Sequence, residues 1–177
     1  MRLPGGLSEL FAHLLPEFFR SGSCDIRRGG ATIRTAGSVF VLFATISTVV
    51  SDLDAFQFAL GVKGASGMVP CSLCRNVVSA RSRLTDFDVS GTLVPFTRTA
   101  LSRFARADDN SIRDSCQLLR SKSAEARAGT MTPAAFDRLE KALGLKYNPT
   151  GLLFAPALVF LKIASMIMYD WMHTYVV

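Results

Sequence analysis

The spacing of apolar residues in the first third of the chain predicts a helix, then a strand, then a second short helix. Residues 7–19 place large apolar side chains at helical spacing, with Ser8 as a candidate cap and Pro16 as a kink. Residues 39–50 form an apolar run that is rich in β-branched side chains and does not alternate. Such a run predicts a strand buried on both faces. Residues 53–60 predict a short helix or turn that a glycine closes.

The rest of the chain predicts mostly helix. Residues 97–107 and 109–128 have helical composition. A threonine–proline pair at positions 132–133 predicts a helix start, with the threonine as cap, and Gly144 predicts its end. With 177 residues, 49% of them apolar, the chain is long enough for one domain with a real core.

These elements predict an α/β fold that is incomplete within this chain. It would contain one helix, one clear central strand and a largely helical, basic insertion. Because one strand does not make a sheet, we expect the other strands to come from outside these residues. We divide the chain into a partial core over residues 1–62, an insertion over 63–150 and an apolar segment over 151–177.

Positive charge is concentrated in the insertion. The chain has a net charge of +6, and residues 75–128 carry ten basic against six acidic side chains. A basic balance favours a polyanion such as DNA as partner, although a solvated helical face would look much the same. The candidate phosphate-binding residues are Arg98, Arg103, Arg106, Arg113, Arg120 and Lys122.

The close pair Cys71 and Cys74 is a candidate zinc knuckle. Two thiolates in a C-x-x-C spacing can share one Zn²⁺, which needs two further ligands. The alternatives are buried inert thiols or a redox pair. No secretory signal begins the chain, so we expect a reducing, intracellular compartment, and with DNA as partner a nuclear one.

Carboxylates at two positions are candidates for metal chemistry. Asp52, with Asp54 as alternative, follows the predicted strand, where the crevice of an open α/β sheet would lie. The alternative is that residue 51 or 52 only caps the next helix. Asp170 and His173 are three residues apart, so on a helix they could meet one cation or each other beside a packed tryptophan.

A membrane-spanning segment is not expected. Residues 36–50 are uncharged, but these fifteen residues fall short of the roughly 20 that a spanning helix needs. Residues 152–168 are also apolar, but they contain Pro156 and Lys162.

Three stretches in this order resemble the transposase of CACTA-type (En/Spm) and plavaka-like DNA transposons. They are residues 51–55 (SDLDA), residues 63–78 (KGASGMVPCSLCRNVV) and residues 169–173 (YDWMH). The resemblance covers roughly residues 40–78 and 166–177, and the segment between them matches in type only.

The resemblance implies an RNase H-like core that cuts and joins DNA with an Asp-Asp-Glu triad and Mg²⁺ or Mn²⁺. Asp52, or Asp54, would be the second acid of the triad. The cysteine pair would begin the insertion domain as a zinc knuckle, and Asp170 with His173 would match the D-x-x-H signature. The first acid should lie on an earlier strand, yet the only earlier aspartate is Asp25. The expected glutamate would lie beyond D-x-x-H, so we expect an internal piece that is inactive alone.

Two other functions compete with a transposase-derived fragment. One is a zinc-stabilised module that binds nucleic acid or protein without catalysis. Metal-dependent folding, with binding that survives Asp52→Ala, would favour it. The other is a small membrane-associated protein using residues 36–50 and 152–168, which extraction only by detergent would favour.

Overall fold

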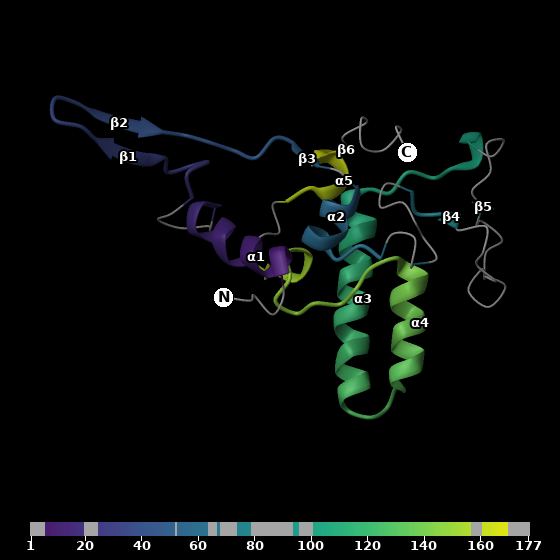
Figure 1. The fold of residues 1–177 in the computed structure, drawn as a ribbon. Helices are drawn as coiled ribbons and strands as arrows, with labels where there is room; N and C mark the ends of the chain where they lie inside the picture. The colour runs from purple at the N-terminus through teal and green to yellow at the C-terminus, as the bar shows by residue number, and fades with distance from the viewer. Residues whose placement is uncertain are drawn as a thin grey trace.

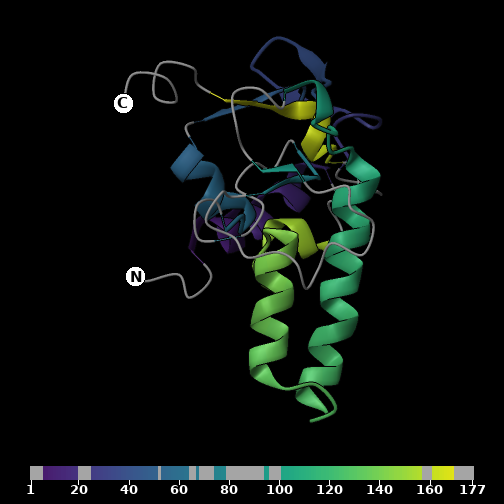
Figure 2. The same cartoon turned by 90° about the vertical axis from the view of Figure 1, so that its right-hand side faces the viewer.

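The computed structural model in Figure 1 describes residues 6–19, 25–51, 53–63, 67, 74–78, 94–95, 101–156 and 161–169. Helices α1 and α2 pack together, and α3 and α4 form a long helical hairpin that projects from the rest (Figures 1 and 2). The helices are α1 Gly6–Phe19, α2 Leu53–Leu60, α3 Asp109–Arg127, α4 Pro133–Leu143 and α5 Ile163–Met166, with 3₁₀ turns at Leu101–Arg103 and Leu152–Phe154.

The strands form three two-stranded sheets within the described residues. β1 pairs with β2 in antiparallel fashion, whereas β3 pairs with β6, and β4 with β5, in parallel. The bounds are β1 Ala31–Arg34, β2 Val39–Leu42, β3 Val49–Ser51, β4 Val77–Val78, β5 Val94–Pro95 and β6 Ile167–Tyr169. The mixed α/β class predicted from the sequence is therefore present.

Local end signals account for the helices. The side chain of Thr132 accepts a hydrogen bond from the Ala135 N–H at 3.2 Å, and Gly144 ends α4 with φ of +68°, as predicted. The predicted cap at Ser8 is wrong, because Ser8 lies inside α1. Its buried hydroxyl instead accepts a hydrogen bond from the Leu152 N–H at 2.9 Å, which ties α1 to the 3₁₀ turn Leu152–Phe154.

The predicted buried strand over residues 39–50 is wrong in length and burial. Only Val39–Leu42 and Val49–Ser51 are strands, and every residue of β2 is exposed. A turn in which the Thr35 N–H donates to the Ser38 carbonyl at 2.9 Å gives β2 a local partner, β1. The two strands form an arm, residues 31–42, that projects from the body (Figure 1). Nothing in the described part of the chain covers it.

The expectation that one strand stands alone is also wrong, because β3 pairs with β6 from the predicted apolar segment. The helix predicted over residues 97–107 is reduced, where described, to the turn Leu101–Arg103. The side chain of Asn76 explains this difference: its amide donates to the Arg103 carbonyl at 2.9 Å and accepts from the Ala105 N–H at 2.6 Å. These bonds hold the backbone extended beside residues 74–76.

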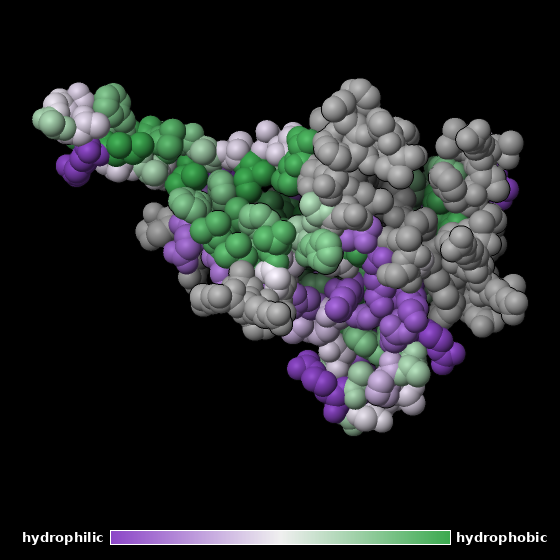
Figure 3. All heavy atoms as spheres, viewed as in Figure 1, coloured by the Kyte–Doolittle hydropathy of each residue, from purple (hydrophilic) through white to green (hydrophobic). Residues whose placement is uncertain are grey.

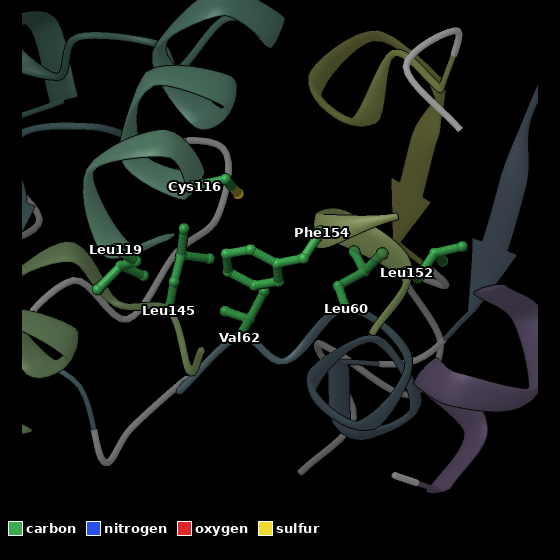
Figure 4. Close-up of a cluster of buried hydrophobic side chains, with 7 residues drawn as sticks. All are labelled: Leu60, Val62, Cys116, Leu119, Leu145, Leu152 and Phe154. Carbon is green, nitrogen blue, oxygen red and sulfur yellow. The ribbon is translucent and has the colours of Figure 1, made fainter. Parts of the chain in front are cut away.

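One apolar core joins all three predicted segments. Figure 4 shows its buried side chains converging from α2, α3 and the chain after α4. Leu119 of α3 is completely buried, and the ring of Phe154 packs edge-on against Tyr147 with centroids 5.0 Å apart. The core residues are Leu60, Val62, Cys116, Leu119, Leu145, Leu152 and Phe154.

A short backbone clip closes the base of the helical hairpin. Val62 and Leu145 form an antiparallel bridge, the Lys63 N–H donates to the Gly144 carbonyl at 2.8 Å, and the Lys146 N–H donates to the Gly61 carbonyl at 2.7 Å. We call residues 61–63 with 144–146 the clip. Among the described residues, no helix combines the length and apolar character needed to cross a bilayer.

Candidate functional site

The β3–β6 sheet pairs two strands that each directly precede a predicted metal-binding acid in the sequence. The two strands run parallel, with Val49 opposite Ile167 and Ser51 opposite Tyr169. Asp52 directly follows Ser51 in the sequence, and Asp170 directly follows Tyr169. The carboxyl ends of paired parallel strands lie at the same sheet edge, which is where open α/β sheets place their ligands. Asp52, Asp170 and His173 themselves lie outside the described residues.

Asp54, the alternative acid, is the second residue of α2. Its assignment as a metal ligand stays a prediction.

Cys74 lies beside the extended backbone of residues 103–106 and forms a bridge with Arg106. It also borders a small cavity of about 120 Å³ between α3 and the end of α4. Cys71 lies outside the described residues, so the zinc knuckle stays a prediction. Within the described part of the chain, no three histidine, cysteine or acidic side chains are grouped to hold a metal ion.

Cys116 of α3 is a core residue. It is 7% exposed, and burial raises the pKa of its thiol to about 11. A protonated thiol is a poor metal ligand and a poor nucleophile.

The predicted phosphate-binding residues fall into two groups. On α3, Arg120 Nη2 donates to the Phe154 carbonyl and Lys122 Nζ lies 2.7 Å from Glu125 Oε1. The helix also carries Asp109, whose carboxylate accepts from the Ala164 N–H at 2.8 Å. With Arg113 half-buried, α3 does not present a uniform basic face.

Arg103 and Arg106, in contrast, are exposed and lie beside a third exposed arginine. The Arg75 N–H donates to the Ala105 carbonyl at 3.0 Å, which places Arg75 across from them. We call Arg75, Arg103 and Arg106 the arginine cluster. Sequence reasoning missed Arg75 because positions 75 and 103–106 are far apart in the chain. Backbone pairing and the side chain of Asn76 bring them together. Arg98 lies outside the described residues.

Asp25, the earlier aspartate, is held by its own loop. It is 3% exposed, and Arg27 Nε and Nη2 donate to its two carboxylate oxygens at 2.7 and 2.6 Å. These hydrogen bonds from Arg27 hold the pKa of Asp25 below its ordinary value. Because Arg27 also donates to the Phe19 carbonyl at 3.1 Å, the pair joins the end of α1 to the base of the arm. Both carboxylate oxygens are thus engaged within the fold.

An apolar groove of about 330 Å³ lies between α1, α2 and the β3–β6 strands. Its lining includes Phe11 of α1, Val50 of β3, Ala59 of α2 and Ile167 of β6. Figure 3 shows that apolar surface also runs from the arm across the neighbouring part of the molecule. The groove and the arm both present apolar side chains to solvent.

Comparisons with protein families, with curated proteins and with solved structures find no match for this chain. The function must therefore be argued from the residues and their placement.

Proposed function

We propose that the chain is a transposase-derived α/β unit of RNase H-like type whose β3–β6 edge presents Asp52 and Asp170 to a divalent cation. The observation that carries the proposal is the parallel register of β3 and β6, which end at Ser51 and Tyr169 opposite one another. Each strand is followed in the sequence by an aspartate. Convergence of carboxylates from different elements is what two-metal phosphoryl transfer requires.

The donor set suits Mg²⁺ or Mn²⁺. Both cations prefer hard oxygen ligands, and carboxylates are the usual protein donors for them. A cation bound at this edge supplies charge stabilisation to the attacking and leaving oxygens of a displacement at phosphorus. The parent activity is then cleavage and transfer of DNA strands. The resemblance assigns this chain one acid of the triad, so we expect it to bind the cation without turning over DNA.

DNA is the proposed polyanion, and the arginine cluster is its proposed contact. Arg103 and Arg106 are exposed, and the backbone bond from Arg75 to Ala105 keeps a third exposed arginine beside them. Exposed guanidinium groups bind phosphate oxygens in bidentate fashion. The basic residues of α3 contribute less, because Arg120 and Lys122 have partners within the fold.

The test is Mn²⁺ binding to the full chain, measured by calorimetry and by the loss of the free Mn²⁺ paramagnetic resonance signal. Asp52→Asn and Asp170→Asn should each weaken binding at least about tenfold, which corresponds to roughly 1.4 kcal/mol for one lost carboxylate ligand. Asp114→Asn is the matched control, because Asp114 is an exposed aspartate on α3. Weakening by Asp54→Asn instead of Asp52→Asn would move the site to the alternative acid. Equal binding by all variants would refute the shared site.

A further inference from the structure

We propose that Asn76 is a positioning residue of the arginine cluster, so that a buried, uncharged side chain controls how strongly the chain binds DNA. This inference rests on the proposed contact between the cluster and DNA phosphates. It adds to that contact a residue that acts through its neighbours and touches no phosphate itself. Asn76 is 8% exposed, whereas all three arginines of the cluster are exposed.

Asn76 lies where three segments of the chain meet. Its backbone carbonyl accepts a hydrogen bond from the Val94 N–H of β5 at 2.8 Å. Its side-chain nitrogen donates to the Arg103 carbonyl at 2.9 Å, and its side-chain oxygen accepts from the Ala105 N–H at 2.6 Å. The Arg75 N–H adds a bond to the Ala105 carbonyl at 3.0 Å. Both ends of the Asn76 amide therefore bind the backbone that carries two of the three arginines.

The strand that follows Asn76 gives these contacts a fixed base. Val77 of β4 and Val94 of β5 lie opposite one another and are only 1% and 2% exposed. A buried amide that is satisfied at both ends makes a rigid and specific connection, because losing either bond leaves a buried polar group unpaired. Residues 103–106 are thereby held beside a packed strand pair, although they form no long helix or strand of their own.

A fixed backbone matters for a cluster of like charges. Guanidinium groups repel one another, so three arginines on a freely moving loop would spread apart. A cluster that is already in place loses less conformational freedom when it binds, and this raises its affinity. Removing the Asn76 amide should therefore lower the number of phosphates that the cluster neutralises at once, while the net charge of the chain stays at +6.

Asn76→Ala tests the proposal in filter-binding titrations of the full chain with duplex DNA at several salt concentrations. We expect the affinity to fall roughly threefold to tenfold. The slope of log affinity against log salt should fall by about 1, because this slope reports the number of phosphates neutralised. A purely structural role would leave the slope of the folded variant unchanged, and that result would overturn the proposal.

Ser8→Ala is the matched control. The Ser8 hydroxyl is also buried and also bonds a distant backbone group, the Leu152 N–H at 2.9 Å, but it belongs to α1. This variant should lower the Tm and leave the salt slope as it is in the wild type. A slope that falls equally in both variants would trace the effect to lost stability and overturn the role of Asn76.

A double-mutant cycle shows whether Asn76 acts through the arginines. In a chain that already carries Arg103→Ala and Arg106→Ala, Asn76→Ala should cause little further loss of affinity, because the residues that it positions are gone. An equal loss in both backgrounds would overturn the proposal.

Hydrogen exchange of the wild-type chain without DNA needs no variant and holds even if Asn76→Ala does not fold. The Ala105 N–H should be strongly protected, and exchange at the rate of an unfolded peptide would overturn the proposal. The two proposals also fail differently. A wild-type chain without salt-dependent DNA binding would refute the DNA contact and the role of Asn76 with it. A slope that Arg103→Ala lowers and Asn76→Ala does not would refute the role of Asn76 alone.

Discussion

Lys63 closes the base of the helical hairpin through an ion pair whose contribution to stability can be measured against a matched control. Its Nζ lies 3.0 Å from Glu140 Oε2 and 3.2 Å from Asp137 Oδ1, and its side chain is only 13% exposed. The Nζ of Lys141 lies 2.7 Å from Asp137 Oδ2, but the Lys141 side chain is 46% exposed. The two lysines share an acidic partner and differ in burial.

Lys63→Met keeps the length of the apolar stem and removes the charge. The side chain of Glu140 is 12% exposed. In this variant it keeps the hydrogen bond that the Tyr147 N–H donates to Oε1 at 2.6 Å, but it loses the ammonium group that neutralises its charge. Losing a partly buried charged hydrogen bond should lower the free energy of unfolding by about 2 kcal/mol. For a chain of this size, that change lowers the Tm by roughly 4–8 °C. Lys141→Met should leave the Tm within error, because exposed pairs contribute little.

Thermal unfolding followed by circular dichroism at neutral pH measures both variants. If Lys63→Met unfolds at the same temperature as Lys141→Met, the ion pair of Lys63 does not stabilise the fold more than the exposed pair of Lys141.

The pH dependence of unfolding is a second test of the same ion pair. Hydrogen bonds from Lys141 first, and then from Lys63, hold the pKa of Asp137 below its ordinary value. A carboxylate with a lowered pKa in the folded chain stabilises the fold at pH values above its pKa in the unfolded chain. This stabilisation is lost as the pH falls through its pKa in the folded chain. The difference in free energy of unfolding between the wild type and Lys63→Met should therefore persist down to about pH 5 and decrease below about pH 4.

Two further predictions concern the arginine cluster and the buried thiol. Arg103→Ala should weaken binding to duplex DNA uniformly across sequences and reduce the slope of log affinity against log salt by about 1. Lys122→Ala should change this slope less, because Lys122 is already paired with Glu125. An unchanged slope in filter-binding titrations would remove Arg103 from the interface. Because burial raises its thiol pKa to about 11, Cys116 should resist iodoacetamide at about pH 8 and react once urea unfolds the chain, as located by peptide mass spectrometry. Alkylation of Cys116 in the folded chain at that pH would contradict its burial.

Sequence reasoning predicted the elements whose signals are local. α2 matches its predicted range, and α4 matches the start and stop signals at Thr132 and Gly144. In α4 the cap, the first turn and the end are all encoded within a few residues. Local signals of this kind do not depend on what the rest of the chain does.

Predictions that depended on a distant partner were less successful. A β-branched run such as residues 39–50 has the same composition whether it is buried in a sheet or exposed in a hairpin. Its outcome was decided by the turn at Thr35–Ser38, which gave β2 a local partner. The arginine cluster likewise depends on the contacts of Asn76 with positions 103 and 105, and no periodicity records those contacts. For the candidate site, the sequence indicated Asp52 and Asp170 separately, but the pairing of β3 with β6 had no local signal.

The clip explains how strands so far apart in sequence come to pair. About 115 residues separate Ser51 from Ile167, and closing such a loop is entropically costly. With residues 61–63 held against 144–146, the connection from β3 to β6 effectively shortens to roughly 30 residues. The logarithmic dependence on loop length makes this worth about 1 kcal/mol to the β3–β6 pairing. Lys63 is the first residue of the stretch that leads to Cys71. It thus favours the pairing of β3 with β6 by stabilising the clip. Its ion pair with Glu140 stabilises the closed base, and the closed base favours the parallel register of β3 and β6 on which the proposed cation site depends.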